Sequence, residues 1–257
     1  MSRTIRNLIV FAAPLVVGIA NLFHPLTGPH QPIYDTVHPV AEWWTVLHVL
    51  NLFGFAALGL AAYLLVLERH GIASTVAKAA LLVFVPAYVG FDAVLGIGTG
   101  NLARYAGSLP VAQLPALKSA MQAFWQDDIA TLLAILGSVA WTVAMGACAV
   151  SFTTARRGVA VGFSVLAAAF TGWGYSASLF GSLAWWISVG LIGAAAALLL
   201  RPAFPPAFLL LSGILLGTTH VVPFGPLGMA FFLAAAAISR AQERTSPVAA
   251  LAASVRG

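Results

Sequence analysis

The feature that most constrains this fold is a set of long stretches without a charged side chain. The two longest are the 43 residues of Gly158–Leu200 and the 38 residues of Pro202–Ser239. Only 7% of the 257 residues are charged, whereas soluble domains carry about 25%. A chain so poor in charge cannot cover a surface that faces water, so lipid must surround most of it. The apolar runs are continuous rather than alternating, which predicts membrane-spanning helices and not a barrel.

Eight spans are expected, because one crossing takes about 20 apolar residues. Gly158–Leu200 is long enough for two of them. The last two, Pro206–Thr219 and Gly228–Ser239, are short and could instead form a re-entrant pair, which would leave seven crossings. The other four are Asn7–Phe23, Trp43–Leu67, Ala79–Gly100 and Ile129–Phe152. The sequence therefore predicts an all-α, polytopic helical bundle.

Basic residues set the expected orientation of this bundle. Ten of the twelve Lys and Arg residues fall on one side of it: Arg3, Arg6, Arg69, Lys78, Arg156, Arg157, Arg201, Arg240, Arg244 and Arg256. Because short loops rich in Lys and Arg stay in the cytoplasm, both termini are predicted to be cytoplasmic. Residues 1–240 would form a single transmembrane domain, and residues 241–257 a short flexible cytoplasmic tail. This is the pattern of a multi-pass protein of a bacterial-type inner membrane.

The opposite, outer side collects the side chains that can do chemistry. Five of the six histidines and five of the seven acids fall there: His24, His30, His38, His48, His220, Asp35, Glu42, Asp92, Asp127 and Asp128. His24 ends the first predicted span and His220 the seventh, while His48 lies about 7 Å inside the second. If the helices pack as one bundle, these groups converge in a pocket that opens to the outside.

Asp92 is the most informative single residue. It lies about 12 Å inside the third predicted span, at 1.5 Å per residue. A carboxylate at this depth costs about 2.5–3.5 kcal/mol on insertion scales and is by default a functional-site hypothesis. Asp92 and Asp128 are the candidate catalytic residues. The plainer interpretations are an Asp92 that only ties helices together, and an acidic pair, Asp127 and Asp128, that complements a helix dipole.

Three histidines are candidate metal ligands, because neutral imidazole is the commonest metal ligand in proteins. They are His24, His48 and His220. A plainer interpretation holds for each, as a helix-packing or interfacial residue. His30 and His38 lie in proline-rich sequence and are expected to be solvated. No HExxH motif and no ligand pair at helical spacing supports the set.

These residues together favour a metalloenzyme. Zinc held by three histidines lowers the pKa of its bound water to about 7, and Asp92 could activate that water. The substrate would be a lipid or an isoprenoid-like molecule that enters from the outer leaflet. A metal-free version would use Asp92 or Asp128 as a general acid in an apolar pocket.

Other functions stay open on the sequence alone. An intramembrane carboxylate near histidines also fits a transporter of protons, a metal ion or a small solute. Two histidines could bind haem b, although the shallow position of His24 argues against it. A non-catalytic membrane subunit is the fourth possibility. The net charge of +5 comes from loop residues, so membrane lipids and not nucleic acid are the expected partners. The oligomeric state is left open.

Overall fold

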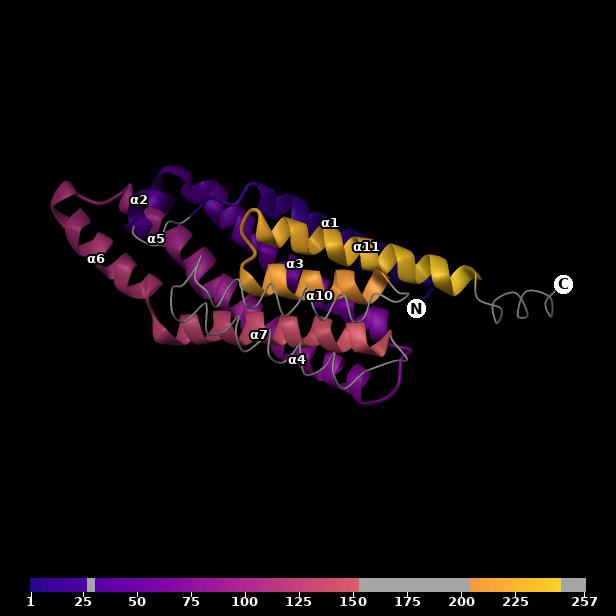
Figure 1. Ribbon diagram of the computed structural model, residues 1–257. Helices are drawn as coiled ribbons and strands as arrows, with labels where there is room; N and C mark the ends of the chain where they lie inside the picture. Colours follow the sequence, from indigo (N-terminus) through magenta and orange to yellow (C-terminus); the bar gives the residue numbers. More distant parts are fainter. Residues whose placement is uncertain (27–30, 153–203, 246–257) are drawn as a thin grey trace.

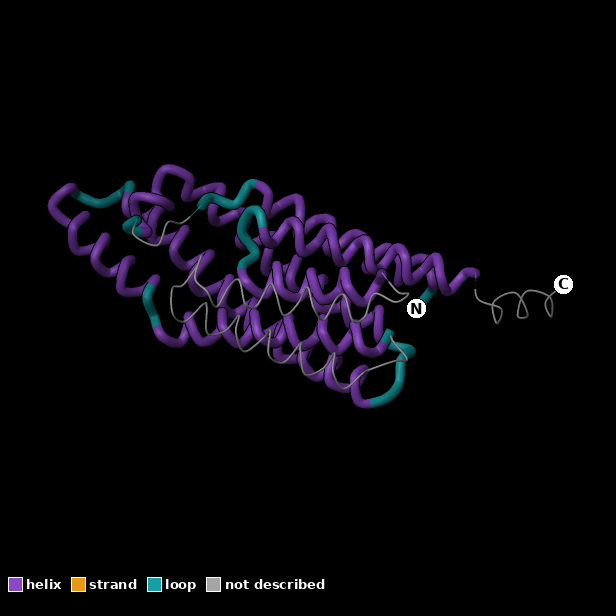
Figure 2. Tube along the Cα trace, viewed as in Figure 1, coloured by secondary structure: helices purple, strands orange, loops and turns teal. Residues whose placement is uncertain are grey.

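The computed structural model describes residues 1–26, 31–152 and 204–245, and these residues contain helices but no strand (Figure 2). The elements in chain order are α1 (Arg3–Leu22), α2 (Ile33–Val37), η1 (His38–Val40), α3 (Ala41–Val66), α4 (Ile72–Phe91), η2 (Asp92–Ile97), α5 (Gly98–Ala106), η3 (Val111–Gln113), α6 (Leu114–Trp125), α7 (Asp128–Ser151), α10 (Phe204–Thr218) and α11 (Phe224–Thr245). The predicted all-α fold class is confirmed over this part of the chain.

Six of these helices pack side by side into a closed ring (Figure 1). Helix α1 contacts α3 and α11, α4 lies between α3 and α7, and α10 joins α7 to α11. Aromatic side chains fill the centre of the ring. Phe84 contacts Phe55 and Trp141 at ring-centroid distances of 6.4 and 4.9 Å, and Trp141 lies 6.1 Å from Phe232. Residues from both ends of the sequence therefore share one core.

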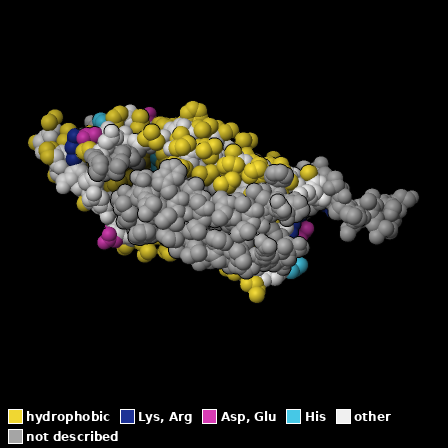
Figure 3. All heavy atoms as spheres, in the orientation of Figure 1, with side chains coloured by type: hydrophobic (Ala, Val, Ile, Leu, Met, Phe, Trp, Pro, Cys, Tyr) yellow, Lys and Arg dark blue, Asp and Glu magenta, His cyan; other side chains and the backbone are white. Residues whose placement is uncertain are grey.

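Five helical segments of the described residues are long and apolar enough to cross a membrane: Arg3–Leu22, Ile33–Val66, Ile72–Ala106, Val111–Ser151 and Phe224–Gln242. A shorter apolar helix covers Pro205–Thr218. Hydrophobic side chains cover the flank of the bundle that is visible over α1 and α11, and charged side chains gather toward its ends (Figure 3). These features indicate a helical protein that is embedded in a membrane.

Five of the predicted spans match helices of the described residues. The four predicted between residues 7 and 152 each overlap a crossing segment, and Pro206–Thr219 corresponds to the short α10. The final span was predicted too short, because α11 extends beyond Gly228–Ser239 at both ends and continues into the predicted tail. The pair of spans predicted within Gly158–Leu200 lies outside the described residues. The total of eight crossings and the side of each terminus stay predictions.

A cap covers one end of the ring, opposite the end where the N-terminus lies (Figure 1). It consists of α2, α5 and α6, which pack against one another. Its small core contains Ile33, Tyr34, Val37, Ala41, Trp44, Ala103, Ala106 and Met121. Trp44 belongs to this core and to α3, so the cap rests directly on that end of the ring.

The junction between α4 and α5 is a π-helical turn that covers Asp92–Ile97. The backbone N–H of Gly98 bonds to the carbonyl oxygen of Ala93, five residues earlier. Trp44 Nε1–H on α3 donates a hydrogen bond to the carbonyl oxygen of Gly96 at 2.8 Å. A Cβ atom on Gly96 would overlap the imidazole of His48. The turn therefore brings the backbone of one helix against a histidine of another, and only glycine leaves room for it.

Candidate metal centre

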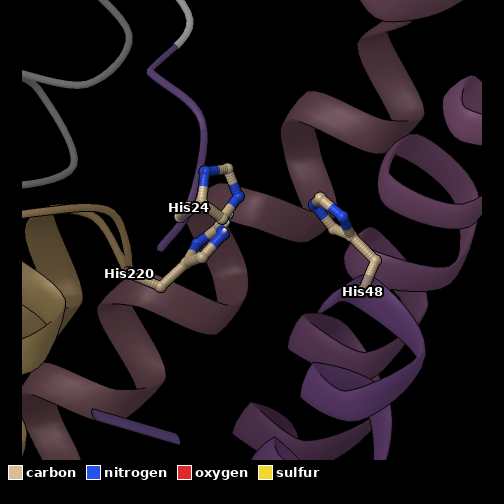
Figure 4. A group of neighbouring side chains, drawn as sticks. All are labelled: His24, His48 and His220. Carbon is tan, nitrogen blue, oxygen red and sulfur yellow. Dashed lines mark hydrogen bonds between the residues drawn. The ribbon is translucent and has the colours of Figure 1, made fainter. Parts of the chain in front are cut away.

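Three histidines from distant parts of the sequence meet beneath the cap (Figure 4). His24 lies two residues after the end of α1, and Trp43 Nε1–H on α3 donates to the adjacent carbonyl of Phe23 at 2.9 Å. His48 lies on α3, and His220 lies in the connection from α10 to α11. One ring nitrogen of each histidine lies within 4.8 Å of the other two. The structure thus brings together the three residues predicted as metal ligands.

The spacing of these nitrogens fits a single bound metal ion. Nε2 of His24 and Nε2 of His220 are 3.3 Å apart. Two imidazole nitrogens at about 2.0–2.1 Å from one tetrahedral zinc ion would be about 3.3 Å apart. The ring of His48 lies 5.2 Å from that of His24 and 6.4 Å from that of His220, between centroids. A small movement of the His48 ring would complete a three-nitrogen site.

Hydrogen bonds to Nδ1 fix the tautomer of two of the rings. Nδ1 of His24 lies 2.7 Å from the carbonyl oxygen of Pro25, and Nδ1 of His48 lies 2.7 Å from that of Trp44. A carbonyl oxygen only accepts, so Nδ1 carries the proton in both rings and Nε2 keeps its lone pair. Metal-binding histidines usually have this arrangement, in which the second nitrogen donates to an oxygen that orients the ring.

The third ring is held by a phenol. Nδ1 of His220 lies 3.3 Å from the hydroxyl oxygen of Tyr88 on α4. Tyr88 lies against α7, where a Cβ atom on Gly137 would come within 2.5 Å of its ring. A hydroxyl both donates and accepts, so it can accept from Nδ1–H when Nε2 of His220 binds a metal ion. Tyr88 can therefore accept a hydrogen bond from Nδ1–H of His220, as the backbone carbonyls do for His24 and His48.

Replacing Tyr88 with phenylalanine is expected to weaken zinc binding by about 10–100-fold, the usual effect of losing an outer-shell partner of a metal-bound histidine. The ring remains to fill the core, but Nδ1 of His220 loses its hydroxyl partner. The zinc affinity is measured by competition with a chromophoric chelator. Tyr63→Phe is the matched control, because Tyr63 lies 15 residues from His48 along α3, about 22 Å away. Equal affinities in both variants would contradict the role of Tyr88.

Burial keeps the two loop histidines neutral. Both His24 and His220 are buried, at 6% and 7% exposure. Burial lowers the pKa of His24 from its ordinary value of 6.5, and the hydrogen bond to Pro25 raises it by less. Burial also lowers the pKa of His220 well below its ordinary value, with smaller contributions from His24 and His48. A neutral imidazole can bind a metal ion without first losing a proton.

Asp92 lies beside the histidines and has no exposed surface. Its Oδ1 is 3.9 Å from Nε2 of His48. Neither of its carboxyl oxygens has a hydrogen-bond partner among the described residues. A buried polar group without a partner costs about 1–3 kcal/mol, and more if it is charged. A buried carboxyl without a partner, 3.9 Å from a nitrogen of His48, is explained if a cation binds to the adjacent histidines.

A pair of amides forms a polar layer next to the histidines. Asn21 and Asn51 exchange two hydrogen bonds of 2.9 and 3.1 Å between α1 and α3, and both are buried. Asn21 lies three residues before His24, and Asn51 three residues after His48. The amides satisfy each other, and Asn21 also donates to the carbonyl of Val17. They hold together the two helices that carry His24 and His48.

The remaining candidates lie elsewhere. Asp128 is exposed at the first turn of α7 and is not part of the histidine cluster. Asp127 caps the same helix, accepting from the N–H groups of Ile129 and Ala130 at 3.0 Å each, which matches its plainer interpretation. His38 is exposed and stacks on Tyr34 in the cap. His30 lies outside the described residues. The catalytic roles of Asp92 and Asp128 stay predictions.

Comparison with known protein families, with curated proteins and with solved structures gives no significant match. The chemistry of this protein must therefore be inferred from the cluster itself. Sequence patterns missed one of its parts, Tyr88. Tyr88 precedes Asp92 by four residues and so lies on the same helix face, a spacing that could have revealed it. The glycines around Asp92, among them Gly96, are typical of close helix approach, and His48 of α3 does lie against Gly96.

Proposed function

We propose that this protein is a membrane-embedded, zinc-dependent hydrolase that acts on a lipid-like substrate. His24, His48 and His220 would bind one zinc ion through Nε2, and Asp92 would accept the proton of the attacking water. The convergence of three buried imidazoles, each with its Nδ1 already paired, is the observation that carries this proposal.

The donor set favours zinc in a catalytic arrangement. Structural zinc sites are closed by four protein ligands, whereas catalytic sites use three and leave one position open. Here three nitrogens are available, and the nearest carboxylate, on Asp92, lies 3.9 Å from one of them. Haem b fits poorly, because a porphyrin ring lies between its two axial ligands, whereas here three imidazole nitrogens lie within 4.8 Å of one another.

Apolar rings around the cluster support a lipid-like substrate. The rings of Phe55 and Phe91 lie 5.7 and 6.3 Å from that of His220, and Trp44 lies 4.5 Å from His48. Among the described residues the cluster consists of three histidines, and the charged group printed beside it is the carboxyl of Asp92, 3.9 Å from His48. These surroundings favour a substrate whose reacting bond is attached to hydrocarbon. Transport and a non-catalytic role, also predicted from the sequence, stay predictions.

Metal content and metal-dependent hydrolysis test the proposal. Detergent-purified protein is expected to contain about one zinc ion per chain, as three-histidine sites do. Removal of the metal with a chelator should abolish hydrolysis of the p-nitrophenyl ester of a medium-length fatty acid, and added zinc should restore it. Protein that contains no zinc and takes up none would refute the metal site. Zinc binding without hydrolysis of this or longer esters would refute the catalytic part alone.

A further inference from the structure

An apolar groove runs along the flank of the ring between α1 and α11. It has a volume of about 410 Å³, which lies within the range of small-molecule sites. Its walls include Pro14, Gly18 and Leu22 on one side and Pro226, Ala230 and Leu233 on the other. All of these side chains are apolar or absent, so the groove offers no partner for a polar group.

One end of the groove is lined by residues close in sequence to two of the histidines. Leu22 lines the groove two residues before His24, and Val222 lines it two residues after His220. These are the two histidines whose Nε2 atoms are 3.3 Å apart. From Pro14 to Leu22 the groove follows α1 over eight residues, or about 12 Å. The groove therefore runs along the bundle toward the end at which the cluster lies.

The position of the groove identifies what would fill it. Helices α1 and α11 are both long and apolar enough to cross a membrane. Large side chains beside the groove, Leu15, Ile19 and Leu227, are about half exposed, and the visible flank over these helices is hydrophobic (Figure 3). In a membrane this flank faces hydrocarbon. The surrounding molecules that match a narrow apolar channel are the acyl chains of lipids.

We propose that this groove binds one acyl chain of a membrane lipid and places the polar end of that chain beside His24 and His220. The inference names the substrate class of the proposed hydrolase and in that respect rests on it. Binding of the chain does not require the metal, so the two proposals can fail separately.

Photolabelling with a lipid probe tests the groove. The protein is reconstituted in phosphatidylcholine vesicles that contain a rising fraction of phosphatidylcholine with a diazirine in one acyl chain, and the adducts are mapped by mass spectrometry. Probe in the bulk lipid labels every membrane-facing helix, and the yield of these adducts rises in proportion to the probe fraction. Residues of the groove are expected to show additional labelling that saturates as the probe fraction rises. Ala230→Phe should lower this saturable labelling about tenfold, because the new ring fills the space for one chain.

Ala237→Phe is the matched control. Ala237 is also exposed, and it lies seven residues, about two turns, farther along the same helix face outside the groove. Its saturable labelling should equal that of the unchanged protein. Ile19→Trp fills the groove from α1 and serves as the second variant if Ala230→Phe does not fold. The proposal is overturned if labelling rises in proportion to the probe concentration at every site, groove included. It is also overturned if Ala237→Phe loses as much saturable labelling as Ala230→Phe, or if crosslinks join two protein chains at the groove.

The zinc content of the same samples separates the two proposals. Saturable labelling of a protein that contains no zinc and takes up none would support the groove and refute the metalloenzyme. About one zinc ion per chain, combined with labelling that never saturates, would overturn the groove and leave the metal site intact.

Discussion

The variant His48→Ala is expected to lose more than about 100-fold in zinc affinity, since a direct ligand matters more than the outer-shell partners, whose loss costs about 10–100-fold. His24→Ala and His220→Ala should behave alike, because each leaves only two nitrogens at the centre. After dialysis against buffered zinc, elemental analysis should find less than about one-tenth of an ion per chain in all three variants, against about one in the unchanged protein.

His38→Ala is the control for these three variants. His38 is exposed in the cap and takes no part in the cluster, so the zinc content of this variant should not change. If His38→Ala lost zinc to the same extent, the loss in the other three variants would come from misfolding of the capped end of the bundle. Full zinc content in any of the three cluster variants would remove that histidine from the site.

Asp92→Asn is expected to retain zinc while kcat/KM for ester hydrolysis falls by about 10²–10⁴, the usual contribution of a general base. The amide has the size of the carboxyl but cannot accept a proton. Because the carboxyl is buried without a hydrogen-bond partner, this variant should unfold at the same temperature as the parent or a higher one. The kinetics, the zinc content and the thermal unfolding temperature are measured on the same preparation.

Asp35→Asn controls for the loss of a negative charge near the capped end of the bundle. Asp35 is exposed and pairs with Lys118 at 2.9 Å in the cap, so its replacement should leave kcat/KM unchanged. Loss of zinc from Asp92→Asn would make Asp92 a fourth ligand instead of a proton acceptor. The same assay on Asp128→Asn tests the other predicted catalytic acid, since a loss there would move the proton acceptor to α7.

The expected depth of each residue in the membrane was enough to predict that the three histidines lie together, while their role as metal ligands stays a prediction. His24, His48 and His220 were expected at similar heights, and in a closed ring of helices residues at one height that face the centre must come together. The identity of the partners of each ring could not be predicted. The Nδ1 atom of His220 finds Tyr88 only because α4 and the α10–α11 connection meet across the core, and no local pattern encodes that contact.

The length of α11 shows where hydropathy fails as a guide to helix ends. The apolar run stops before Arg240, and the prediction ended the span there. The helix continues to Thr245, because its backbone hydrogen bonds persist wherever water or headgroups can solvate the side chains. Charge marks where hydrocarbon ends, and it does not mark where a helix ends.

The π-helical turn between α4 and α5 gives this bundle a built-in rotational offset. Each residue of an α-helix advances the chain by about 100°, and the wider turn at Asp92–Ile97 accommodates one more residue than regular winding would. Before the turn, one face of α4 packs against the aromatic core. After the turn, Gly98–Ala106 is rotated so that it packs against the cap. Deleting one residue here would restore regular α-helical winding, and it would rotate either Asp92 away from the histidines or Gly98–Ala106 away from the cap. The π-helical turn therefore lets the two ends of this helix face different directions.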